Sequence, residues 1–114
     1  MELKKMKTLS KKTRKRIVER INSHFKPEKI ILFGSYAYGT PKKNSDVDLF
    51  IVMETEDKPS KRRIEISGLF RDRQMPMDFI VKTPSEVKER LLMGDFFINR
   101  ILKKGEVLYE KKIG

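Results

Sequence analysis

GSYAYG at residues 34–39, followed by SDVDL at residues 45–49, is the stretch that decides the fold of this chain. An apolar run at residues 30–33 precedes it, and a second apolar run continues to residue 53. Short, continuous apolar runs of this kind predict strands that are buried on both faces. The glycine and serine after the first run predict a turn into a brief helix, which Gly39 and Pro41 end.

One helix is expected before this pair of strands in the sequence and another after it. Apolar spacing predicts an amphipathic helix over about residues 10–24, which Pro27 ends. Pro59 suits the first turn of a helix to about Asp72, which we expect to bury Ile64 and Leu69 or Phe70.

The C-terminal part repeats the alternation. Residues 77–81 predict a third strand, and the capping-box pattern at residues 83–86 opens a helix that should bury Val87, Leu91 and Leu92. Residues 96–102 predict another helix, which ends at Gly105, and residues 107–109 predict a short last strand. The fold class is therefore α/β, a small mixed sheet with helices packed against it.

Length and composition place the protein among small intracellular proteins. We expect residues 1–114 to form one domain. The absence of cysteine suits a reducing cytoplasm. No apolar run approaches the roughly 18 residues that a membrane span needs, and the N-terminus lacks the apolar segment of a signal peptide.

The net charge of +11 is concentrated at the N-terminus. Residues 1–26 hold ten Lys or Arg residues against Glu2 and Glu19, and residues 1–9 are expected to form a basic, frayed segment. Such charge attracts polyanions such as RNA or an acidic protein. A solvated helix face is the favoured interpretation, because no aromatic residues interleave with the charges as stacking sites.

Three aspartates carry the candidate chemistry. Asp46 and Asp48 project to the same side of a strand, where two carboxylates repel each other unless a cation lies between them. Oxygen-only ligands favour Mg²⁺ or Mn²⁺ over zinc. Asp78 stands at the start of the third strand, so the three carboxylates converge if the two strands are neighbours. Two metal ions about 4 Å apart would then serve a phosphoryl transfer.

Gly34 and Ser35 supply the expected nucleotide-binding half of the site. A strand that turns into a helix presents unpaired N–H groups, and the helix dipole favours anions there. Gly34 lets a phosphate approach closely, and the Ser35 hydroxyl can donate a hydrogen bond to a phosphate oxygen. The combination of this turn with the three acids predicts a site for metal and nucleotide phosphates.

These motifs resemble the signature of the polymerase-beta-type nucleotidyltransferases, and in particular of the minimal nucleotidyltransferase (MNT) group. The resemblance extends from about Ile17 to Tyr109 and implies the nucleotidyltransferase fold. It implies that Asp46 and Asp48 ligate both metal ions, while Asp78 binds one and takes the proton of the attacking hydroxyl. Many members carry arginine where this chain has Tyr38.

The resemblance also implies an activity and a partner. The reaction would be attack on the α-phosphate of ATP with release of pyrophosphate, leaving AMP on the acceptor. Similar minimal nucleotidyltransferases are antitoxins that transfer AMP to a tyrosine of a HEPN-domain RNase toxin. Two alternatives remain: an antitoxin that neutralises its toxin by binding alone, and a transferase that acts on nucleic acid or a small molecule.

Overall fold

The computed structural model describes residues 9–42 and 44–112. Most of the basic segment predicted at residues 1–9 therefore lies outside the described residues. Leu9, which we expected in the frayed segment, is instead buried in the core. The Arg14 guanidinium donates a hydrogen bond to the Leu9 carbonyl and holds it beside the first helix.

Strands and helices alternate as predicted, with four strands in one sheet. The strands are β1 (Lys29–Phe33), β2 (Val47–Val52), β3 (Met77–Lys82) and β4 (Glu106–Glu110). The helices are α2 (Lys11–His24), α3 (Ser35–Tyr38), α4 (Pro59–Gly68), α5 (Pro84–Leu92) and α6 (Phe96–Lys104).

The sheet is mixed, in the order β3-β2-β1-β4. Strand β1 pairs antiparallel with both β2 and β4, whereas β2 and β3 run parallel. Because β2 and β3 are parallel, their first residues lie at the same end of the sheet. The α/β fold class with a small mixed sheet is thus confirmed.

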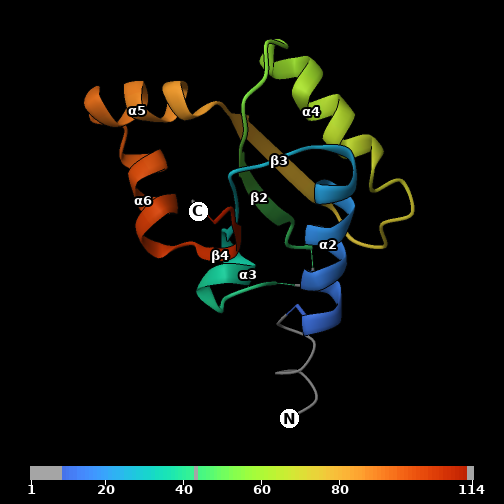
Figure 1. The fold of residues 1–114 in the computed structure, drawn as a ribbon. Coiled ribbons are helices and arrows are strands. Elements are labelled where there is room, and N and C mark those ends of the chain that lie inside the picture. Colours follow the sequence, from blue (N-terminus) through green and yellow to red (C-terminus); the bar gives the residue numbers. More distant parts are fainter. Residues whose placement is uncertain (1–8, 43, 113–114) are drawn as a thin grey trace.

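Helices cover both faces of the sheet (Figure 1). On one face, α2 and α4 bury Ile17, Ile21 and Ile66 against alternate residues of the strands, such as Leu49. On the other face, α6 buries Ile98 against a second set that includes Phe50. Strand β2 therefore contributes to both cores, which explains its continuous apolar run.

Helix starts follow the capping signals in the sequence. The Ser10 hydroxyl accepts a hydrogen bond from the Thr13 N–H at the start of α2. Thr83 and Glu86 form the predicted capping box at the start of α5. Asp95 caps α6 by accepting from the Ile98 N–H. Among the described residues, no helix is long and apolar enough to span a membrane.

The prediction of burial is wrong for three residues. Ile64 is 70% exposed, and Leu91 and Leu92 are 39% and 79% exposed. Helical spacing predicted one apolar face for each helix, but α4 turns Ile66 rather than Ile64 toward the sheet. Helix α4 also ends at Gly68 instead of continuing to about Asp72.

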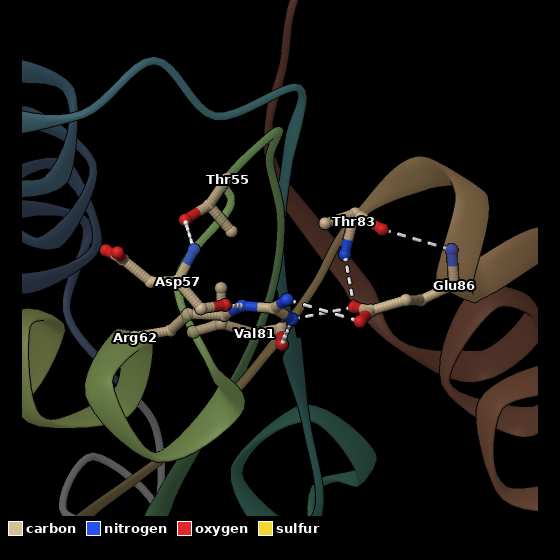
Figure 2. Close-up of polar contacts among 6 residues, drawn as sticks. All are labelled: Thr55, Asp57, Arg62, Val81, Thr83 and Glu86. Atoms are coloured by element: carbon tan, nitrogen blue, oxygen red, sulfur yellow. Dashed lines mark hydrogen bonds and ion pairs between the residues drawn. The ribbon is translucent and has the colours of Figure 1, made fainter.

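The buried Arg62 side chain joins α4, β3 and α5 through a set of hydrogen bonds (Figure 2). Its side chain is 6% exposed, and its guanidinium donates to the Asp57 and Val81 carbonyls at 2.7 and 3.2 Å. Both terminal nitrogens also donate to the Glu86 carboxylate, at 2.7 and 3.2 Å. The same carboxylate accepts from the Thr83 N–H, so the ion pair and the cap of α5 form one unit.

Substituting Arg62→Ala should destabilise the fold by about 3–5 kcal/mol, because it leaves a carboxylate and two carbonyls without their donor. Arg63→Ala is the matched control, since the neighbouring side chain is exposed, and it should change stability by no more than about 0.5 kcal/mol. Urea denaturation of both variants measures the difference. Equal losses of stability in the two variants would show that the Arg62 contacts contribute little to the stability of the fold.

Candidate active site

The register of β2 and β3 places two of the predicted acids side by side. Asp48 and Asp78 are direct partners across the parallel pair, and alternation puts them on the same face of the sheet. Asp46 precedes β2 by one residue and belongs to the same alternating set. Asp46 and Asp78 are exposed, while Asp48 is partly buried. The condition stated for convergence of the acids, that the two strands are neighbours, is therefore met.

Gly34 lies directly against the Asp48 carboxylate. A Cβ atom added to Gly34 would stand 2.2 Å from the Asp48 Oδ2 atom. The antiparallel pairing causes this approach, because Phe33 at the end of β1 is the partner of Asp48 near the start of β2. Gly34 also has a φ of 76° and a ψ of −161°, a region that is essentially restricted to glycine. Both geometry and space thus require glycine at this position.

The pKa of Asp48 is raised from 3.8 to about 6. Burial is the largest cause, and repulsion from the Asp78 and Asp46 carboxylates follows. Both neighbouring carboxylates thus act electrostatically on Asp48. A bound cation would favour ionised Asp48, since an opposite charge nearby stabilises the charged form.

The carboxylates are not gathered as a finished metal site. Within residues 9–42 and 44–112, no group of three His, Cys, Asp or Glu side chains is arranged to hold a metal ion. Asp78 instead turns its Oδ1 atom to the Phe79 N–H, which donates to it at 3.0 Å. The donor set nevertheless suits a hard divalent cation, because all three side chains offer carboxylate oxygens from neighbouring backbone positions.

The turn predicted for nucleotide phosphates forms at the end of β1. Gly34 is the N-cap of α3, and its carbonyl accepts from the Ala37 and Tyr38 N–H groups. The first N–H groups of a helix, here those of Ser35 and Tyr36, have no acceptor within the helix. Gly39 ends α3 with a φ of 78°. The turn therefore presents donors beside the Asp48 carboxylate.

Arg100 is a residue that the sequence did not point to. Its guanidinium carbon lies 5.1 Å from the centre of the Tyr38 ring, a cation–π contact between α6 and α3. It brings an exposed positive charge to Tyr38, the last residue of α3. Tyr36 and Ala37 pack against the core instead. Only the fold could reveal Arg100, which is 62 positions away from Tyr38 in the chain.

Comparison with known proteins identifies the domain type. A family model described as the nucleotidyltransferase domain matches residues 14–108. A search of curated proteins gives no significant match.

Solved structures share the fold. A mutant of the toxin–antitoxin MntA–HpeT aligns with a TM-score of 0.62 and 20% identity, over 87% of this chain and 74% of the other. A toxin–antitoxin structure with AMP-PNP gives a TM-score of 0.63 and 21% identity over the same shares. A candidate nucleotidyltransferase from Sulfolobus solfataricus gives 0.61 and 26% identity, over 88% of this chain and 79% of the other. The chain thus has the nucleotidyltransferase fold.

Gly34→Ala should destabilise the protein through contact with Asp48 as well as through backbone strain. Gly39→Ala is the control, because its φ is also positive but no atom lies within 4 Å of the added Cβ. We expect about 1–2 kcal/mol of loss for Gly39→Ala and a clearly larger loss for Gly34→Ala.

The steric part should disappear when the carboxylate is removed. In the Asp48→Ala background, the Cβ atom is the part of this side chain that remains. It lies 3.4 Å from the added methyl group, which is an ordinary contact. Denaturation of the two single variants and the double variant gives the coupling directly. If the stability losses of the two single variants add up to the loss of the double variant, the result would contradict the described contact.

Asp48→Asn should stabilise the metal-free protein at neutral and higher pH. Asp48 ionises near 3.8 when unfolded and about 6 when folded, so between these values the folded state binds more protons. Stability therefore falls as pH rises through this window, and the full penalty remains above it. After a discount for solvent screening, the gain on substitution is about 1–2 kcal/mol near pH 8 and vanishes near pH 4.

Urea denaturation in the presence of a chelator measures this pH dependence. A variant that is less stable than the natural chain near pH 8 would show that Asp48 does not suffer the described repulsion.

Proposed function

We propose that this chain, which belongs to the nucleotidyltransferase domain family, transfers AMP from ATP to a hydroxyl side chain of a protein partner. The partner is a HEPN-domain toxin, and its acceptor residue is a tyrosine. The observation that carries the proposal is the pairing of Asp48 with Asp78 on neighbouring strands, with Asp46 just before β2 and Gly34 of the turn against Asp48. Such a site combines acids for a divalent cation with donors for phosphate.

The roles of the residues follow from their positions. The N–H groups and the hydroxyl at the Gly34–Ser35 turn bind oxygens of the triphosphate, and Arg100 adds a positive charge at the Tyr38 end of the same helix. Asp46 and Asp48 hold Mg²⁺, for which Mn²⁺ can substitute, together with Asp78. When bound, this cation neutralises charge on the phosphates and on the acids themselves.

The chemical step is a displacement at phosphorus. The acceptor hydroxyl oxygen forms a bond to the α-phosphorus of ATP as the bond to the bridging oxygen breaks, and pyrophosphate leaves. Asp78 takes the hydroxyl proton. Its position at the edge of the sheet suits this role, because its exposed carboxylate can be reached by an acceptor. Positioning and charge stabilisation supply most of the rate enhancement.

An exposed apolar turn supports a protein partner. Residues at the end of α5 and the start of α6 leave large apolar side chains in solvent, although helical spacing predicted that some of them would be buried. Exposed apolar clusters on a small protein are typical of interaction surfaces. The cluster comprises Leu91, Leu92, Met93, Phe96 and Phe97.

Asp46→Ala and Asp48→Ala should each lower transfer at least about a hundredfold, because both remove charge that positions the reacting phosphate. The assay follows label from α-labelled ATP with Mg²⁺ to the protein encoded beside this chain in its genome. Glu19→Ala is the control, since its carboxylate is exposed on α2, and it should transfer normally.

Two results would count against this assignment. Full transfer by both aspartate variants would place the site elsewhere. Inhibition of the toxin without any transfer of label by the natural chain would favour an antitoxin that acts by binding alone.

A further inference from the structure

A groove runs along the edge of the sheet and ends at Asp78. Two adjoining hollows, of about 640 and about 370 Å³, lie between the outer side of α4 and β3. They share Arg63 and Phe79 in their linings, so they form one channel from Lys82 to Asp78. We call it the α4–β3 groove. Figure 1 shows α4 beside β3, which is an edge strand of the sheet.

The lining of the α4–β3 groove is strongly basic. Arg63, Arg71 and Arg73 line the larger hollow, and Lys82 lines the smaller one. Asp78 is the acid in this lining. Among the described residues, none of these four cations forms an ion pair, whereas the adjacent Arg62 is fully paired. Four positive charges thus line the groove without a carboxylate partner among the residues that the structure describes.

The groove is preformed in part. The Arg73 guanidinium donates to the Ser67 and Phe70 carbonyls at 3.4 and 3.2 Å, which holds it at the rim. Ile64 is 70% exposed and lines the same hollow, so it offers an apolar contact beside the charges. A ligand with carboxylates and some apolar side chains matches this surface.

The edge of β3 itself is partly occupied. Its even-numbered peptide groups face β2, because the Pro76 carbonyl accepts from the Val47 N–H and the Lys82 carbonyl accepts from the N–H of Met53, directly after β2. Of the outward groups, the Val81 carbonyl accepts from Arg62, and the Phe79 N–H donates to Asp78. Recognition in the groove therefore depends more on side-chain charge than on pairing with the strand.

We propose that the α4–β3 groove binds an acidic, extended segment of the protein acceptor and leads its hydroxyl residue to Asp78. This inference rests on the proposed function, because Asp78 is the residue to which the acceptor hydroxyl must come. The acidic character of the segment follows from the unpaired cations. A nucleic acid fits less well, because the aromatic ring in the lining, that of Phe79, is buried and offers no face for base stacking.

Charge reversal in the groove tests the proposal. The double variant Arg63→Glu/Arg71→Glu is compared with Lys12→Glu/Lys15→Glu on α2, which changes the net charge equally at exposed positions. The probes are a fluorescent peptide in which Glu and Val flank one Tyr, the same peptide with Lys for Glu, and a single-stranded RNA. Binding to the full chain is measured by fluorescence anisotropy without ATP at low and moderate salt.

We expect the acidic peptide to bind the natural chain and to lose about tenfold or more in affinity in the groove variant only. The Lys peptide should not bind, and binding of an ATP analogue should be equal in all three proteins. Equal weakening in both double variants, no binding of the acidic peptide, or tighter groove-dependent binding of the RNA would overturn the proposal.

Failure of the groove and failure of the proposed function give different results. Transfer of AMP to the natural partner that is unaffected by Arg63→Glu/Arg71→Glu would refute the groove and leave the transferase intact. Groove-dependent binding of the acidic peptide, with no transfer to any protein, would retain the surface and refute the reaction.

Discussion

The contact between Gly34 and the Asp48 carboxylate is the constraint on which the rest of the site depends. Antiparallel pairing brings the end of β1 to the start of β2, so the turn after one strand faces the acid on the other. Only a residue without a side chain leaves room for the Oδ2 atom at this point. The turn after β1 is thereby held against the Asp48 carboxylate. Under the proposed function, this is where a phosphate and the cation that neutralises it would be held.

The surrounding fold supports a locally unfavourable arrangement. Asp48 is partly buried between two other carboxylates, yet it occupies a strand whose neighbours are packed on both faces. Burial of Leu49, Phe50 and Ile51 stabilises the strand independently of the acid. The strand therefore keeps Asp48 in a position that its own charge disfavours, as is common where function sets the residue.

Local signals in the sequence predicted local structure well. The apolar runs gave β1 and β2 their positions, the Thr83–Glu86 pattern predicted a capping box, and Gly39 ended α3. The predicted burial of Ile64 and Leu92 is wrong because periodicity identifies an apolar face but not whether another element covers it. No rule of spacing could pair Arg62 with Glu86 or place Arg100 on Tyr38, because those contacts depend on how distant elements pack. The acids themselves were visible, but the pairing of Asp48 with Asp78 depended on β2 and β3 being parallel neighbours.

The two bonds on the outer side of β3 have a consequence for the protein in concentrated solution. An open edge strand is a template onto which a second molecule can add its own sheet, and growth by this route leads to fibres. Here Arg62 engages one carbonyl of that edge and the Asp78 side chain engages one amide. Like-charged arginines next to the edge would also repel a second copy that approached in the same way. A surface that attracts an oppositely charged chain thus also discourages the molecule from polymerising with itself.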